Sequence, residues 1–454
     1  MSGSASPTSV ALRRPPTSDE VSDILACRST SDQVGDFLQR RAVEAVLETI
    51  SAAIEGDVGP LRCTIERSKL KPGSRLTVSA TVRAPGLQPR PVTAIWGILP
   101  PQLASGLPSP VDGSRPSAPF TTLTLSPQAS GETRLHVFVA PADPAFPSLG
   151  ELYDPEHLAP LLGSQGIEVT ASDIAVVPLR YRPGQRHVLR LDLAERGRCL
   201  YVKCYRDETG AQALAAWHCV QAALTDWRGP VDAVQPVGYL PAQRVMLWEG
   251  SRGTALGESL DSSRAPIGTA GAALRAIHDS GVDPRQRSLR SDPASEAAST
   301  RRACEHVAAL LPGLGTAAVA LAEGAVRSLD ERPAETGHRL HGDYKCDNIL
   351  VEGDRLRLLD LDRVTVGDPA LDLGKMSADL RWWAAQRGLD ATPLVDAFLE
   401  GYGRCAPLRL HRAAGYDRLF MLRLIGRRVP LHEPGWADRV HTMLAAVSPV
   451  GVSR

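Results

Sequence analysis

The segment HGDYKCDNILVEGDRLRLLDLD, residues 341–362, concentrates ionisable and amide side chains around two short apolar runs. Asp343 and Asn348 lie five residues apart without helical periodicity, which predicts a tight loop leading into a strand, NILV. The turn EGDR would return the chain through a second strand, RLRLLD, and so bring Asp360 beside Asn348. A carboxylate and a carboxamide at one end of a hairpin suit Mg²⁺ that is also bound by substrate phosphates. Asp343, just outside this pair, could accept a proton from an attacking hydroxyl.

These groups match the parts that phosphoryl transfer requires, which include a lysine from a strand of another lobe that contacts the nucleotide phosphates. Lys203, in the strand-like segment LYVKCY, is the candidate for that lysine. The turn RPGQR stands where a phosphate-covering loop would lie, which makes Gly184 and Arg186 candidate nucleotide contacts. Lysine is rare in this Arg-rich chain, so each lysine is a candidate for a role that needs lysine, although genomic base composition could produce the same bias. The lysines are Lys69, Lys71, Lys203, Lys345 and Lys375.

Two motifs, HGDYKCDNILV and LLDLDRVTVGDPALDLGK, resemble the signatures of the aminoglycoside phosphotransferase and choline kinase-like family. The resemblance covers about residues 173–450. It implies a protein-kinase-like fold, ATP as phosphoryl donor, Mg²⁺, and a small-molecule hydroxyl as acceptor. The matching residues follow the order of the family's motifs: His341, Gly342, Asp343, Asn348, Asp360, Gly367, Asp368, Pro369 and Asp372.

The resemblance also implies individual roles. Asp343 resembles the catalytic base, and Lys203 resembles the lysine on the α- and β-phosphates of ATP. The other implied roles are metal ligation by Asn348 and Asp360 and support of the catalytic loop by His341 and Asp372. Apart from the resemblance, we expect Asp362 to support the loop rather than to bind metal.

Two further assignments concern the nucleotide and the transferred phosphate. The segment LWEG, residues 247–250, resembles the hinge that receives adenine and makes Glu249 a candidate nucleotide contact. Lys345 lies two residues after Asp343, as in the D-x-K-x-x-N arrangement of protein kinases. Its ammonium group could therefore reach the transferring phosphate as part of the catalytic set.

One departure from the kinase pattern leaves an alternative open. Related kinases pair the strand lysine with a glutamate on the next helix, where this chain offers only Glu208 before the helix or Gln212 within it. A weakened pair would suit a nucleotide-binding pseudokinase or a regulatory partner. A protein kinase is disfavoured, because Gly342 replaces the usual Arg and no APE-type segment follows the metal-binding Asp.

The C-terminal part of the chain informs the choice of acceptor. Residues 381–454 contain eleven Arg but six acidic residues. If these residues line the acceptor site, a neutral or anionic acceptor fits better than a polycationic one. The same excess would also arise from arginines on solvated helix faces.

The pattern of elements predicts an α+β, protein-kinase-like fold with a β-rich N-lobe, a helical C-lobe and an N-terminal α/β accessory region. Helical periodicity runs from Asp32, a candidate N-cap, to Gly56, a candidate stop. Strand-like runs follow, and a Pro-rich connection separates them from the N-lobe. The predicted boundaries are 1–17 for a disordered tail, 18–150 for the accessory region, 151–172 for a linker, 173–250 for the N-lobe and 251–454 for the C-lobe.

The accessory region resembles the N-lobe locally. LKPGSRLTVSATV at 70–82 aligns with YRPGQRHVLRLDL at 181–193, an offset of 111 residues. This alignment indicates either a degenerate copy of the N-lobe, without an equivalent of Lys203, or two unrelated hairpins around a Pro-Gly turn.

Composition excludes several other classes of protein. The 51 basic and 51 acidic residues balance, so we expect no nucleic-acid partner. The eight cysteines occur singly and predict reduced thiols rather than a zinc site. The first residues lack the apolar core of a signal peptide, and no apolar run is long enough to span a bilayer. We therefore expect a cytoplasmic protein without a membrane partner.

Overall fold

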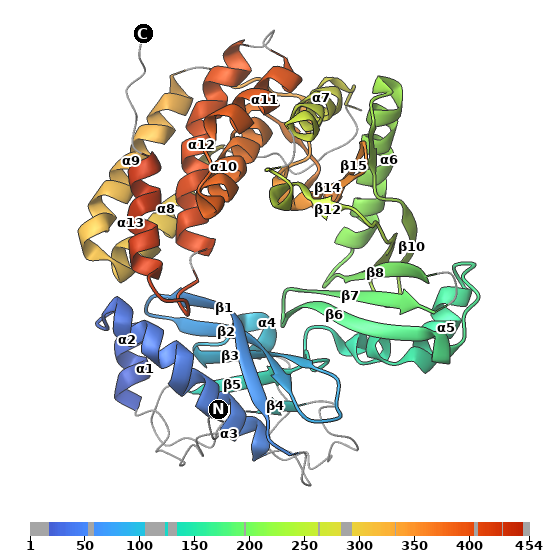
Figure 1. Cartoon of the computed structure of the whole chain (residues 1–454), viewed down its shortest axis with the longest axis vertical. Coiled ribbons are helices and arrows are strands. Elements are labelled where there is room, and N and C mark those ends of the chain that lie inside the picture. Colours follow the sequence, from blue (N-terminus) through green and yellow to red (C-terminus); the bar gives the residue numbers. More distant parts are fainter. Residues whose placement is uncertain are drawn as a thin grey trace, which may run out of the picture.

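The structure is a computed structural model that describes residues 18–52, 59–104, 123–125, 134–194, 197–261, 264–282, 293–331, 333–403, 407–428 and 430–447. Figure 1 shows three parts: an N-terminal region of helices and a sheet, a small β-rich lobe, and a large helical lobe. The predicted α+β, two-lobed class is confirmed. The predicted disordered tail, residues 1–17, lies outside the described residues.

Helix α1 (Ser18–Leu25) is followed, after a short connection, by a continuous helical run of α2 (Ser31–Asp36), the π-helical segment η1 (Phe37–Arg41) and α3 (Ala42–Ser51). The N-cap of α2 is Thr30, not Asp32 as expected, because Thr30 and Gln33 form a capping box. The predicted stop, Gly56, lies outside the described residues. The apolar face is buried as the periodicity predicts, and the Phe37 ring packs edge-on against Trp96 of the neighbouring sheet.

The N-terminal sheet contains β1 (Arg62–Lys71), β2 (Arg75–Arg83), β3 (Arg90–Gly97), β4 (Leu123–Leu125) and β5 (Leu135–Val139). Its strands are antiparallel in the order β1-β2-β3-β5-β4. A short helix, α4 (Pro101–Ala104), follows β3.

The sheet of the small lobe contains β6 (Ile174–Arg182), β7 (Arg186–Leu193), β8 (Arg198–Cys204), β10 (Pro236–Leu240) and β11 (Val245–Glu249). Its strands are also antiparallel, in the order β6-β7-β8-β11-β10. Helix α6 (Thr209–Trp227) and strand β9 (Val231–Ala233) lie between β8 and β10 in the chain. The two five-stranded sheets thus share one strand connectivity.

The segment 151–172 is not the linker that its prolines suggested. It contains η3 (Glu151–Tyr153), α5 (Pro155–Gly163) and the start of η4 (Ala171–Asp173). Pro155 occupies the first turn of α5, where proline is well tolerated, and the Asp154 carboxylate accepts a hydrogen bond from the Glu156 N–H at 3.0 Å. Pro155 therefore begins a helix, and Pro160 lies within the same helix.

The large lobe is mainly helical and carries the predicted hairpin. Strands β14 (Ile349–Glu352) and β15 (Arg355–Leu358) pair antiparallel, which confirms that prediction, and β15 also runs parallel to β9. Strand β12 (Thr254–Ala255) extends this sheet, while β13 (His338–Leu340) pairs with β16 (Thr365–Gly367). The helices are α7 (Ala265–Asp279), α8 (Pro293–Leu310), α9 (Pro312–Asp330), α10 (Ala370–Arg387), α11 (Thr392–Tyr402), α12 (Pro407–Arg428) and α13 (Trp436–Val447). Among the described helices, none has the length and hydropathy that a membrane span needs.

A shared hydrophobic core joins the N-terminal region to the small lobe. Ile95 of β3, Leu103 of α4 and Phe138 of β5 belong to the same buried cluster as Leu189 of β7 and Val202 of β8. Leu158 and Leu162 of α5 also belong to it. The N-terminal region is therefore packed against the lobe that carries Lys203 and is not joined to it only by a flexible linker.

Candidate active site

Asp343 lies in the loop after β13, where two ammonium groups flank its carboxylate. Lys375 Nζ, from α10, lies 2.7 Å from Asp343 Oδ1, and Lys345 Nζ lies 3.1 Å from Oδ2. Burial raises the pKa of Asp343, but the two lysines outweigh burial and hold the pKa well below its usual range. Asp343 is therefore ionised throughout the neutral pH range and is able to accept a hydrogen bond.

The loop that carries Asp343 is fixed by Asp372, near the start of α10. The Asp372 carboxylate accepts hydrogen bonds from the N–H groups of His341 (2.7 Å) and Gly342 (2.9 Å). Gly342 has a φ of 74°, and a Cβ there would lie 2.1 Å from the Arg363 carbonyl oxygen, so only glycine fits. His341 is fully buried, with Nε2 3.2 Å from the Leu359 carbonyl oxygen. These contacts hold the backbone of the loop next to Asp343.

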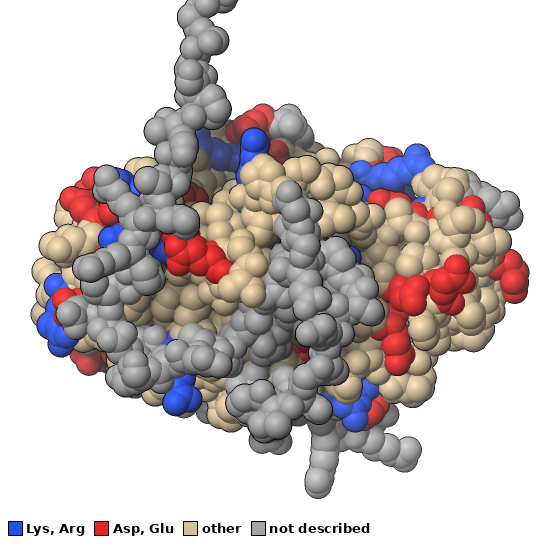
Figure 2. All heavy atoms as spheres, turned by 90° about the horizontal axis from the view of Figure 1, so that it is seen from below, with Lys and Arg blue, Asp and Glu red and all other residues tan. Residues whose placement is uncertain are grey.

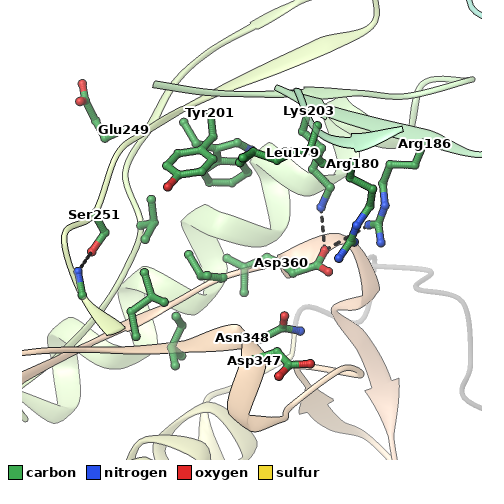
Figure 3. Close-up of a pocket in the computed structure, with 18 residues that line it drawn as sticks. Leu179, Arg180, Arg186, Tyr201, Lys203, Glu249, Ser251, Asp347, Asn348 and Asp360 are labelled. Atoms are coloured by element: carbon green, nitrogen blue, oxygen red, sulfur yellow. Dashed lines mark hydrogen bonds and ion pairs between the residues drawn. The ribbon is translucent and has the colours of Figure 1, made fainter. Parts of the chain in front are cut away.

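The two residues assigned to a metal lie on neighbouring segments that frame the same pocket (Figure 3). Asn348 ends η7 (Cys346–Asn348) and donates from Nδ2 to the Asp343 backbone oxygen at 2.9 Å. Asp360 follows β15 with a φ of 59°, and burial raises its pKa while Lys203 and Arg186 lower it to about 2. An amide oxygen and an ionised carboxylate fit Mg²⁺ bound partly by phosphate oxygens.

Lys203, on β8, is held by two carboxylates of the large lobe. Its Nζ lies 2.6 Å from Asp360 Oδ1 and 2.6 Å from Asp362 Oδ2, and the Tyr205 hydroxyl donates to Asp362 at 2.8 Å. Glu208 is exposed and instead accepts a hydrogen bond from Tyr239, at 2.9 Å. Gln212 is also exposed, on the solvent side of α6. Lys203 therefore pairs with Asp360 and Asp362, and Glu208, which the sequence offered as its partner, does not contact it.

A pocket of about 360 Å³ opens between the two lobes beside Lys203. Its lining is mostly apolar and aromatic, while Lys203, Arg186, Asn348 and Asp360 gather at one end (Figure 3). An apolar slot with polar groups at one end suits a planar base joined to phosphates. The apolar and aromatic lining residues are Leu179, Val188, Tyr201, Val234, Trp248, Leu350, Leu358, Leu359 and Leu361.

The structure treats the three remaining nucleotide candidates differently. Arg186 Nη1 lies 3.6 Å from Asp360 Oδ1, inside the pocket. Glu249 also lines the pocket, but its carboxylate points away in Figure 3 and pairs with Arg198. Gly184 does not line this pocket, because its N–H donates at 2.8 Å to Asp143 of the N-terminal region. Its amide is therefore engaged in holding the two sheets together.

Lys375 is a site residue that we did not predict. It lies three residues after Asp372, close to one turn of α10, and it also donates to the Gly342 carbonyl oxygen at 3.0 Å. The scarcity of lysine was the available signal. Lys203, Lys345 and Lys375 all line the site, and Lys69 lines a cleft that also reaches Asp343.

Comparison with known proteins identifies the family. A model of the phosphotransferase enzyme family (APH) matches residues 180–415, slightly more than half of the chain. The chain belongs to the phosphotransferase enzyme family. The predicted resemblance is therefore confirmed, and this APH-family chain is a small-molecule phosphotransferase by membership. No curated protein matches it significantly.

Solved structures similar to this phosphotransferase share little sequence with it. A choline/ethanolamine kinase family protein from Mesorhizobium loti is 21% identical, with a TM-score of 0.42, over 60% of this chain and 87% of that one. Spectinomycin phosphotransferase APH(9)-Ia is 13% identical, with a TM-score of 0.45, over 63% and 92%. The choline kinase LicA from Streptococcus pneumoniae is 16% identical, with a TM-score of 0.41, over 64% and 99%.

Proposed function

We propose that the protein transfers the γ-phosphoryl group of ATP to a hydroxyl group of a small molecule in a Mg²⁺-dependent reaction. The observation that carries this proposal is the position of Asp343. Its carboxylate lines a wide cleft that adjoins the nucleotide-sized pocket, and Asp360 lines both cavities. An acceptor in the cleft would therefore meet Asp343 next to the nucleotide phosphates.

Asp343 is suited to orient the acceptor hydroxyl and to receive its proton late in the reaction. Because Lys375 and Lys345 lower its pKa, the carboxylate is a weak base that does not deprotonate a free alcohol. Phosphoryl transfer passes through a loose transition state, in which the hydroxyl becomes acidic only as the new bond forms. A weak, ionised, fixed acceptor is sufficient for that step.

Lysine charges would offset the phosphates at two points. Lys203 would exchange its contacts with Asp360 and Asp362 for contacts with the nucleotide phosphates. Lys345 reaches from the Asp343 side and would face the transferring group. Asn348 and Asp360 would hold Mg²⁺, which when bound offsets charge on the phosphate oxygens.

A nucleotide-binding pseudokinase is the second candidate, and one observation favours it. Glu208 is turned to Tyr239 and Arg244, so the helix glutamate that positions the strand lysine in related kinases is missing from the site. Under this alternative the chain binds ATP but does not turn it over.

The test is acceptor-dependent ADP formation by the wild type and by Asp343→Asn. We expect Asp343→Asn to lower kcat by about 10²–10⁴-fold while the Kd for ATP changes little, since general acid–base groups contribute that range. Asp354→Asn, an exposed change in the turn between β14 and β15, is the matched control. ATP binding without turnover across a broad acceptor panel would support the pseudokinase, and full activity of Asp343→Asn would refute the role of Asp343.

A further inference from the structure

The wide cleft beside Asp343 is built by all three parts of the molecule. It has a volume of about 760 Å³ and is lined by Arg67 and Lys69 of β1, by Arg182 of β6, and by residues of the catalytic loop, α10 and α12. A second compartment of about 610 Å³ shares Arg67, Arg182 and Arg427 with it and extends to Trp382 and Trp383. Together they form one space on the acceptor side of Asp343.

The charges of this space are strongly unequal. Eleven Lys and Arg residues line the larger compartment, against five Asp. Several of these cations have carboxylate partners: Lys345 and Lys375 flank Asp343, and Arg428 lies 3.1 Å from Asp347 and 3.0 Å from Asp379. The excess therefore resides in the lining cations that have no such partner.

Three of those cations lack an anionic neighbour. Among the described residues, no carboxylate lies within 4.0 Å of Arg67, Lys69 or Arg182. Lys69 and Arg182 are half-buried, and partial burial together with neighbouring positive charges lowers the pKa of Lys69 to about 8 and that of Arg182 to about 9. Holding such charges together costs folding free energy, and a bound anion would recover it.

Strand β1 is fixed so that its basic face points into the cleft. Arg67 and Lys69 alternate with the buried residues Ser68 and Leu70, as successive strand residues do. The hydroxyl of Ser68 lies 3.0 Å from His432 Nδ1, which ties β1 to the segment between α12 and α13. This strand is a wall of the cleft, and its cations are placed by packing.

The outer face of the N-terminal region looks different. Figure 2 shows the face that the N-terminal region and the small lobe present at the bottom of Figure 1, where the described basic and acidic residues are interspersed and much of the surface is uncharged. Arg62 and Arg83, which pair across the end of the β1–β2 hairpin, are exposed and do not line the larger compartment or the smaller one. The basic concentration thus belongs to the cleft and is not a general property of the region.

We propose that this cleft binds the acceptor, that the acceptor is a hydroxylated small molecule with two or more negative charges, and that Arg67 and Lys69 of the N-terminal region bind it. The proposal rests on the proposed phosphotransferase function. Guanidinium and ammonium groups bind phosphate and carboxylate oxygens through charge-assisted hydrogen bonds, so a phosphate ester and a polycarboxylate share the chemistry required. The N-terminal region then completes the substrate site and is not an accessory to it.

The first experiment compares acceptors in matched pairs, with ATP and Mg²⁺, by ADP formation. One arm pairs polyols and sugars with their phosphate esters, and the other pairs them with hydroxylated polycarboxylates. We expect turnover to prefer the charged member of a pair, and the more active arm identifies the anionic group. We also expect the acceptor KM to rise with ionic strength more than the ATP KM, because screening weakens charge contacts.

The second experiment removes the charges. Arg67→Ala/Lys69→Ala should raise the acceptor KM about tenfold or more and leave the ATP KM within about twofold, since hydrogen bonds to charged groups contribute strongly to binding. Arg62→Ala/Arg83→Ala, with the same charge change on the same hairpin, should leave both unchanged. If the best acceptor is neutral and its KM is unchanged in Arg67→Ala/Lys69→Ala, the inference is refuted, while the phosphotransferase function is still supported.

A binding measurement separates the two failures when no acceptor turns over. Inorganic phosphate and citrate are titrated calorimetrically onto the protein saturated with AMP-PNP and Mg²⁺, which occupies the nucleotide pocket. Binding that is lost in Arg67→Ala/Lys69→Ala supports an anion site even if the phosphotransferase function fails. Absence of binding, or binding unaffected by the double change, refutes the anion site.

Discussion

The N-terminal sheet and the sheet of the small lobe have the same strand connectivity, but equivalent residues of the two sheets line a pocket in one case and a buried core in the other. In the hairpins, Lys71 pairs with Arg75 and Arg182 pairs with Arg186, and each turn contains a glycine with positive φ, Gly73 or Gly184. Next to the turn the two hairpins have the same register, so these positions correspond at the offset of 111 residues noted in the sequence. Farther from the turn the registers differ, because the bulge lies between Ile65 and Arg67 in β1 but between Pro178 and Arg180 in β6.

The third strand shows where the sheets differ. In the small lobe, Val188 of the second strand pairs with Lys203 of the third. Thr77 corresponds to Val188 in the N-terminal sheet, and it pairs with Ile95, which is therefore the equivalent of Lys203. Lys203 faces the nucleotide pocket, whereas Ile95 is 3% exposed and belongs to the core shared with the small lobe. Strand connectivity therefore does not by itself make a nucleotide site, because at this position one sheet presents an ammonium group to a pocket and the other buries an apolar side chain in a core.

We propose that the N-terminal sheet is a degenerate copy of the small lobe. The shared connectivity, the register shared by the three residue pairs next to each hairpin turn, and a helix before the first strand of each sheet, α3 or α5, support a duplication. An unrelated pair of Pro-Gly hairpins would explain the first hairpin but not the order of the remaining strands.

The largest effect should come from replacing Lys203, the residue that distinguishes the sheet of the small lobe from the N-terminal sheet. Lys203→Met removes the phosphate contact and leaves Asp360 and Asp362 without their ammonium partner, so we expect kcat/KM for ATP to fall about 10²–10³-fold. Ile95→Met, at the corresponding position, should cost less than about 1.5 kcal/mol of stability and no activity. Steady-state kinetics and urea unfolding check both, and an equal loss of activity in Ile95→Met would refute the assigned correspondence.

A smaller effect should follow from separating the sheets. Asp143 Oδ2 lies 2.8 Å from the Gly184 nitrogen and 2.7 Å from His187 Nε2, and the side chains of Asp143 and His187 are fully buried. Asp143→Ala leaves both partners unpaired, so we expect the free energy of unfolding in urea to fall by about 3 kcal/mol. Asp36→Ala breaks only the exposed pair with Arg40 and should change it by less than about 1 kcal/mol. Similar losses would show that the buried contact does not join the sheets.

The smallest effect concerns the pH dependence of kcat, which the pKa of Asp343 controls. Lys375 and Lys345 lower the pKa of Asp343 against the effect of burial, so removing Lys375 should raise that pKa. The acid limb of kcat in Lys375→Met should therefore move to higher pH, so that the ratio of kcat at pH 5 to kcat at pH 8 is lower than in the wild type. Lys375→Arg keeps the charge and should keep the wild-type limb. Profiles from pH 4.5 to 9 test this, and an unmoved limb in Lys375→Met would show that Lys375 does not control Asp343.

The sequence was most informative where the partners are close along the chain. His341, Asp343, Asn348 and Asp360 lie within one loop and hairpin, so their spacing indicated that they would meet. Lys375 was missed although it follows Asp372 by three residues, because its contact with Asp343 depends on where α10 crosses the loop.

Contacts between distant segments could not be predicted from spacing. Asp143 binds a turn 41 residues away, and Ser68 contacts His432, 364 residues away, through packing that no local pattern encodes. Gly184 was read as a phosphate contact because a Pro-Gly turn has the same local sequence whether its N–H meets a nucleotide or a buried carboxylate. The prolines near the start of α5 suggested a linker for a similar reason, since proline is common both in linkers and in the first turn of a helix.

The shared core has a consequence for how the chain can be divided. A fragment cut at residue 173, where the sequence suggests that a kinase begins, would expose Leu189, Val202 and the other apolar side chains that Ile95, Leu103 and Phe138 now cover. Such a fragment would have an apolar surface prone to aggregation rather than a lobe with an optional attachment removed. The smallest unit that should be expressed, crystallised or recombined with another protein therefore includes the N-terminal sheet.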